Sequence, residues 1–116
     1  MIIWHNSNCS KSRECIKVLD EKSINFVVRE YLIDTPSKEE LEEVIVMMNL
    51  SNVRDMMRVK EDEYKELDLD NQDKTNSDLI DAMVKFPKLI ERPLGINKGV
   101  AIVGRPLDNI LGLVLI

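Results

Sequence analysis

The sequence predicts an α/β fold: a four-stranded mixed sheet, built from a βαβ unit and then a ββα unit, with a helical insertion in the middle. Short apolar runs near both ends have the length of strands. Two segments of the middle begin with capping boxes and continue at helical spacing. All four glycines lie in the last 22 residues, where a hairpin is expected. We therefore expect one domain over residues 1–116, with the insertion over roughly residues 37–86.

The first three predicted elements form the βαβ unit. Residues 1–4 are an apolar run that is typical of a short buried strand. Residues 10–21 have helical periodicity, with Cys15 and Leu19 on the apolar side. Residues 25–31 are rich in β-branched and aromatic side chains, which favours a second strand. A strand, a helix and a strand in this order indicate a parallel pair joined by a crossover helix.

Helices dominate the predicted insertion. Ser37 with Glu40, and Thr75 with Asp78, form two capping boxes that each begin a helix. The stretch between these helices, residues 51–74, predicts only short helical turns. Pro87 ends the second helix because proline cannot continue the hydrogen-bond ladder.

Two strands and a helix are expected at the end of the sequence. Residues 94–96 and 100–103 predict strands, and the intervening Asn97-Lys98-Gly99 is typical of a hairpin connection. Pro106 suits the first turn of a closing helix.

The composition describes an ordinary globular protein and excludes several classes. Hydrophobic residues make up 44% and charged residues 32% of the chain. No apolar stretch approaches the length of about 18 residues that a membrane helix needs, and the N-terminal apolar run lacks the basic leader of a signal peptide. We expect a cytoplasmic protein without a membrane partner. In that compartment the two cysteines are expected to be free thiols.

Charge is unevenly distributed along the sequence. The net charge is −5, yet residues 34–81 carry 15 acidic and 6 basic side chains, whereas the remainder carries 6 acidic and 10 basic ones. The acidic balance argues against nucleic acid as a partner. We interpret most of the middle carboxylates as a solvated helical surface.

Cys9 is the candidate reactive residue, within the run HNSNCSKSR. It directly precedes the predicted helix, whose unpaired amides and dipole favour a negative charge. His5 and Lys11 add positive or hydrogen-bonding groups, and Ser12 can donate a hydrogen bond to the sulfur, so the surroundings favour a thiolate. Cys15 lies on the apolar helix side and is interpreted as core. Because position 12 is serine, an external thiol must resolve Cys9.

The run HNSNCSKSR resembles the active-site loop of the glutaredoxin-linked arsenate reductase family, which reads His-Asn-x-x-Cys-x-x-Ser-Arg. The resemblance continues through EYLIDTPSKEEL, VRDMMRVKEDEYKEL, SDLIDAMVKFPKLIERP and the closing VGRP. It implies a thioredoxin-like fold with a helical insertion, which agrees with the element order derived from the sequence.

The resemblance also implies roles for individual residues. Cys9 matches the nucleophile that attacks arsenic, and His5 and Ser12 match the residues that stabilise its thiolate. Guanidinium groups bind tetrahedral oxyanions bidentately, which lysine cannot do. The residues that match the three oxyanion-binding arginines and the active-site cis-proline are Arg58, Arg92, Arg105 and Pro93.

The implied reaction is the reduction of arsenate to arsenite through a covalent adduct between Cys9 and arsenate. Glutathione then acts as co-substrate and glutaredoxin removes the glutathionyl group. The expected partners are therefore arsenate, glutathione and glutaredoxin, with no metal and no bound cofactor.

Two other functions stay open at the level of the sequence. A thiol oxidoreductase of the same fold can act on another oxyanion or on a glutathionylated substrate, since fold does not fix function. The superfamily also includes redox-sensing regulators that bind RNA polymerase. Those regulators usually carry Cys-x-x-Cys, a pattern that Ser12 interrupts here.

Overall fold

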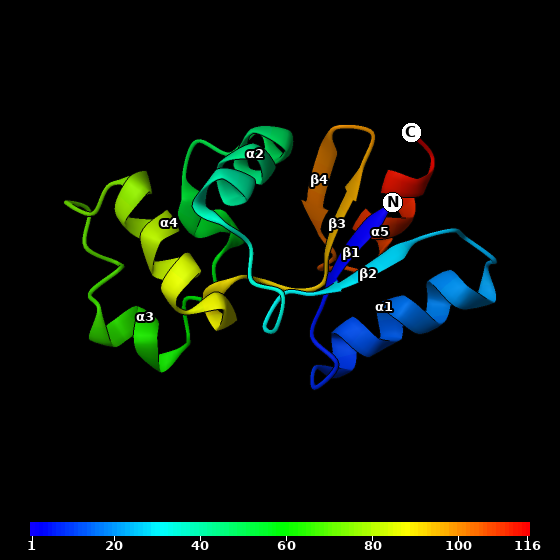
Figure 1. The fold of residues 1–116 in the computed structure, drawn as a ribbon, viewed down its shortest axis with the longest axis horizontal. Helices are drawn as coiled ribbons and strands as arrows, with labels where there is room; N and C mark the ends of the chain where they lie inside the picture. Colours follow the sequence, from blue (N-terminus) through cyan, green and yellow to red (C-terminus); the bar gives the residue numbers. More distant parts are fainter. The chain divides into compact units, whose positions relative to one another are not determined.

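The computed structural model describes residues 1–116 and divides them into two compact units (Figure 1). Met1–Asp34 and Arg92–Ile116 form the first unit, and Thr35–Glu91 form the second. The second unit extends slightly beyond the predicted insertion over residues 37–86. The chain thus leaves the first unit after its second strand and returns to it before its third.

A four-stranded mixed sheet is the centre of the first unit. Its strands are β1 (Ile2–His5), β2 (Val27–Glu30), β3 (Leu94–Asn97) and β4 (Val100–Val103), in the spatial order β2-β1-β3-β4. β1 pairs in parallel with β2 and antiparallel with β3, and β3 pairs antiparallel with β4. The predicted sheet of a βαβ unit followed by a ββα unit is confirmed.

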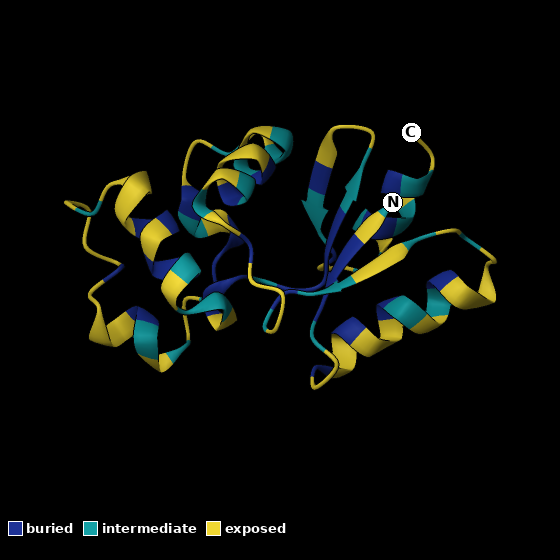
Figure 2. Cartoon of the chain, viewed as in Figure 1, coloured by how far each residue is buried: buried dark blue, intermediate teal, exposed yellow.

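Helices α1 (Ser10–Glu21) and α5 (Asp108–Val114) pack on the same face of this sheet. Figure 2 shows their buried stripes in dark blue. The residues of this core that are 0% exposed come from β1, α1 and α5, and they are Ile3, Cys15, Leu19 and Ile110. Gly95 of β3 permits this close packing, because a Cβ there would lie 2.6 Å from Cδ1 of Ile110. The bounds predicted for α1 are those observed.

The closing helix begins later than the sequence predicts. Pro106 precedes α5 and lies outside its first turn, so the expectation for this proline is wrong. The side-chain amide of Asn109 donates to the carbonyl oxygens of Val103 at 3.1 Å and Arg105 at 3.4 Å. These bonds satisfy the backbone of a bent loop between β4 and α5, which occupies the place of the expected first helical turn.

The second unit is helical, as predicted. Its elements are α2 (Lys38–Met48), η1 (Val53–Met56), α3 (Asp62–Glu66), α4 (Asn76–Lys85) and η2 (Pro87–Leu89). Both capping boxes are present: Ser37 Oγ accepts from the amide of Glu40 at 3.1 Å, and Thr75 Oγ1 from the amide of Asp78 at 3.1 Å. The amide of Thr75 donates to Oδ2 of Asp78 at 2.9 Å, which lowers the pKa of the Asp78 carboxyl.

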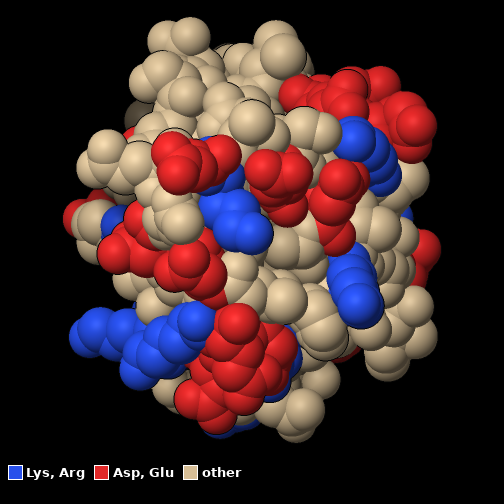
Figure 3. Space-filling view, turned by 90° about the vertical axis from the view of Figure 1, so that its left-hand side faces the viewer, with Lys and Arg blue, Asp and Glu red and all other residues tan.

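Acidic side chains are prominent on the helical unit. Figure 3, which views the side of α3 and α4, shows several groups of acidic side chains with basic ones among them. This mixture fits the interpretation of the middle segment as a solvated surface. None of the helices has the length and apolar character that crossing a membrane requires.

Candidate active site

Cys9 caps the N-terminus of α1, directly after the loop that leaves β1. The loop is closed by the amide of Cys9, which donates to Asn6 O at 3.0 Å, and by the amide of Asn8, which donates to Asn6 Oδ1 at 3.0 Å. The carbonyl of Cys9 accepts from the amide of Arg13 at 3.0 Å. The first turn of α1 has no acidic residue, so the helix start favours a negative charge on the sulfur.

The guanidinium of Arg105 lies beside the sulfur of Cys9. Its Nη2 donates to Sγ at 3.7 Å, and its Nε donates to the carbonyl oxygen of Arg92 at 2.8 Å, which fixes the orientation of the group. Cys9 is only 8% exposed, whereas Arg105 is exposed. The arrangement therefore holds a partly shielded sulfur next to a cation that an anion from solvent can reach.

His5 and Ser12, which lie on either side of the loop between β1 and α1, form a buried pair. Nδ1 of His5 lies 2.6 Å from Oγ of Ser12, which also accepts a hydrogen bond from the amide of Asn6 at 3.1 Å. On the other side of the ring, Nε2 lies 4.0 Å from Oε1 of Glu30 in β2. The pair thus links the end of β1, the first turn of α1 and the neighbouring strand.

His5 is neutral at pH 7 in this environment. Burial lowers the pKa of its imidazole below 6.5, the nearby charge of Arg13 lowers it further, and Glu30 opposes both. The network is satisfied when the Ser12 hydroxyl donates to Nδ1 and the proton of the ring lies on Nε2, toward Glu30. Ser12 is then engaged with His5 and Asn6, and no hydrogen bond joins it to the sulfur. The roles of His5 and Ser12 toward the thiolate stay predictions.

Arg92 and Pro93 directly precede β3. Arg92 is 8% exposed, and the Arg92–Pro93 peptide bond is cis, the form that the resemblance implies. The carbonyl of Pro93 accepts from the amide of Gly104 at 2.8 Å, which ties the start of β3 to the loop that carries Arg105. A Cβ on Gly104 would lie 2.6 Å from Cγ1 of Ile110 and 3.0 Å from Cγ of Pro93, so only glycine fits without displacement.

Arg58 belongs to the second unit. Its Nη1 lies 2.5 Å from Oε1 of Glu61, and its Nε lies 3.9 Å from Oε1 of Glu91. The amide of Arg58 donates to Leu89 O at 2.7 Å, beside the bridge between residues 57 and 90. The structure therefore joins Cys9 with Arg105 and the backbone of Arg92 within the first unit, and the participation of Arg58 stays a prediction.

Cys15 has a different environment from Cys9, although both are free thiols. It is 0% exposed in the core of the first unit, and burial raises the pKa of its thiol to about 11. Its side chain is therefore protonated and inert at neutral pH. The chain shows no group of three or more histidine, cysteine or acidic side chains that can hold a metal.

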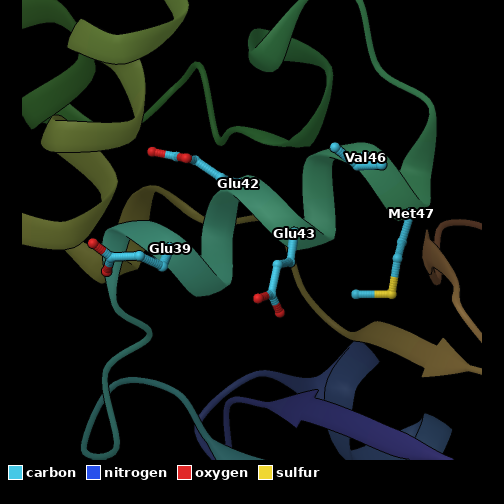
Figure 4. Close-up of a pocket in the computed structure, with 5 residues that line it drawn as sticks. All are labelled: Glu39, Glu42, Glu43, Val46 and Met47. Atoms are coloured by element: carbon cyan, nitrogen blue, oxygen red, sulfur yellow. The ribbon is translucent and has the colours of Figure 1, made fainter.

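Sequence reasoning did not single out Asn6, which organises the active loop through its carbonyl, amide and side-chain oxygen. Its place two residues after the strand predicted over residues 1–4, and its match to the asparagine of the family's loop, were the available signals. A separate cavity of about 550 Å³ lies along α2 and does not include Cys9 or Arg105. Val46 and Met47 line it together with three carboxylates (Figure 4). Those carboxylates disfavour an oxyanion.

Comparison with known proteins yields consistent matches. The model of the ArsC family matches residues 4–113. The chain is 45% identical over 108 residues to an arsenate reductase of Neisseria meningitidis, covering 93% of this chain and 92% of the relative. It is 40% identical to an arsenate reductase of Haemophilus influenzae, with 96% of each chain covered. The solved structure of an arsenate reductase from Vibrio cholerae superposes with a TM-score of 0.93 at 43% identity, covering 97% of this chain and 95% of that one.

Proposed function

The chain belongs to the ArsC family, and from this premise we propose that it reduces arsenate to arsenite with Cys9 as the nucleophile. The observation that carries the proposal is the guanidinium of Arg105, which donates to Cys9 Sγ at 3.7 Å at the start of α1. The names of the relatives from Neisseria and Haemophilus support arsenate as the substrate.

Electrostatics explain why the reaction needs this arrangement. Arsenate is an anion at neutral pH, a thiolate adds a second negative charge, and the chain has a net charge of −5. Their approach is unfavourable unless local cations and helix amides offset the repulsion. Arg105 and the N-terminus of α1 provide both at the sulfur. In the proposed site Arg92 and Arg58 add further guanidinium groups, and Pro93 shapes the adjoining backbone.

The proposed chemistry proceeds through a covalent adduct. The Cys9 thiolate displaces an oxygen from As(V), which leaves as water, and an S–As bond forms. The thiolate of glutathione attacks the Cys9 sulfur, so that an S–S bond forms while the S–As bond breaks, leaves its electron pair on arsenic and releases arsenite. Glutaredoxin and a second glutathione then remove the glutathionyl group from Cys9. Overall, arsenate and two glutathione thiols give arsenite, one disulfide and water, a reduction by two electrons. The proposal calls for no resident metal or organic cofactor, and it places the reaction in the cytoplasm, where glutathione is reduced.

A coupled assay with arsenate, glutathione and glutaredoxin tests the proposal. Turnover should be abolished in Cys9→Ser, because no second thiol lies at the helix start. Cys15→Ser is the matched control and should keep most of the turnover, since its thiol is buried and protonated. Phosphate in place of arsenate controls for unspecific thiol oxidation. Full turnover by Cys9→Ser would remove Cys9 from the mechanism.

A further inference from the structure

A cavity of about 240 Å³ opens beside the proposed active site in the first unit. One wall is the first turns of α1 and the other is the loop between β4 and α5. The residues that line it are Lys11, Glu14, Gly104, Arg105, Pro106 and Leu107. Arg105 connects the two sites, because its guanidinium also reaches Cys9 Sγ at 3.7 Å. Cys9 itself does not line the cavity, so a molecule in it would share Arg105 with the sulfur.

The two charged side chains on the α1 wall are available to a ligand. Lys11 and Glu14 are three residues apart, which places them on the same side of the helix. Both are exposed, and neither forms an ion pair or a side-chain hydrogen bond within the protein. With Arg105, the cavity presents two cations and one carboxylate.

We propose that this cavity binds glutathione, as the site of the thiol co-substrate of the proposed function on which this inference rests. Glutathione at neutral pH has two carboxylates and one ammonium group, which is the complement of the charges that line the cavity. Lys11 would bind a carboxylate of the peptide, and Glu14 would bind its ammonium group. The tripeptide would then hold its thiol near Cys9, where the arsenic adduct forms.

Steady-state kinetics with single variants test the assignment. Lys11→Gln and Glu14→Gln should each raise the KM for glutathione about fivefold, the effect of about 1 kcal/mol from one ion pair at 1.4 kcal/mol per tenfold. The direction in which Glu14→Gln changes the KM for glutathione distinguishes two explanations. Glutathione is a net anion, so simple charge attraction predicts that removing a carboxylate lowers its KM, whereas binding of the ammonium group predicts that KM rises.

Two controls separate binding from indirect effects. Lys17→Gln and Glu21→Gln remove the same charges from exposed positions further along α1 and should leave the KM for glutathione unchanged. With 2-mercaptoethanol as the reductant, which has no charged groups, Glu14→Gln should behave like the original protein. A lower KM for glutathione in Glu14→Gln, or an equal loss with 2-mercaptoethanol, would overturn the assignment.

A binding experiment tests the site without turnover. S-methylglutathione cannot react, and we expect it to shift the NMR amide signals of Lys11, Glu14 and Leu107, with a weaker affinity in Glu14→Gln. NMR shifts at these amides in a protein that does not reduce arsenate would support the glutathione site and contradict the proposed function. Turnover with glutathione but no shifts at these amides would remove the site and leave the proposed function in place.

Discussion

Ser12→Ala tests whether the Ser12 hydroxyl holds the active loop together or serves the sulfur. The side chain is 0% exposed, and its Oγ bonds both Nδ1 of His5 at 2.6 Å and the amide of Asn6 at 3.1 Å. Alanine leaves both groups without this partner. A buried polar group without a partner costs about 1–3 kcal/mol, with the lower end for the partly exposed Asn6 amide. We expect the free energy of unfolding to fall by about 2–4 kcal/mol.

Urea denaturation of the purified variant measures this loss, with Ser10→Ala as the matched control. Ser10 is exposed at the first position of α1 and forms no side-chain hydrogen bond, so its replacement should change stability by less than about 0.5 kcal/mol. If Ser12→Ala is as stable as the original protein while the alkylation of Cys9 slows, the hydroxyl does not hold the loop together. That outcome would mean that the hydroxyl acts on the sulfur.

Three further predictions concern packing, proton binding and the oxyanion site. Gly104→Ala should lower the free energy of unfolding by about 1–3 kcal/mol through overpacking, whereas Gly112→Ala, with open space around it, should raise it by about 0.5–1 kcal/mol in a urea titration. Because burial lowers the pKa of His5, the unfolded chain takes up its proton first, so stability should fall as the pH drops below 6.5. Glu61→Gln should lower the KM for arsenate about two- to fivefold, because Glu61 competes with the oxyanion for Arg58.

A different observation would contradict each of these three predictions. Equal stability changes in the two glycine variants would show that the loop before α5 is less tightly packed than the structure indicates. His5 is the only histidine, so its titration can be followed directly by NMR, and a midpoint above 6.5 would contradict the lowering of its pKa by burial. Glu66→Gln removes an equal charge from an exposed position of α3 and should leave the KM for arsenate unchanged. A similar decrease in both variants would indicate a general charge effect.

Local signals in the sequence were sufficient for most of the fold. Capping boxes at Ser37 and Thr75 begin helices where they were predicted, because the reciprocal bonds span only three residues. The bounds of α1 were also predictable from its periodicity. Pro106 was misassigned because α5 begins only at Asp108, after a loop whose carbonyl oxygens at Val103 and Arg105 accept from the side-chain amide of Asn109.

The candidate site depends on contacts that local patterns do not contain. Arg105 reaches Cys9 across 96 positions of sequence, and the pairing of β1 with β3 and of β3 with β4 brings these segments together. The resemblance, and not the spacing, singled out Arg105. The partner of Ser12 also differs from the expected one: the sequence suggested a hydrogen bond to the sulfur of Cys9, whereas the hydroxyl bonds Nδ1 of His5.

The most direct test of the central claim is the alkylation of the folded protein by iodoacetamide at neutral pH, read by mass spectrometry. We expect that Cys9 is labelled, that arsenate slows this labelling, and that Cys15 is labelled only after unfolding, because burial raises the pKa of its thiol to about 11. Equal labelling of both cysteines, or a rate at Cys9 that arsenate does not change, would show that Cys9 is not a reactive thiol beside an oxyanion site.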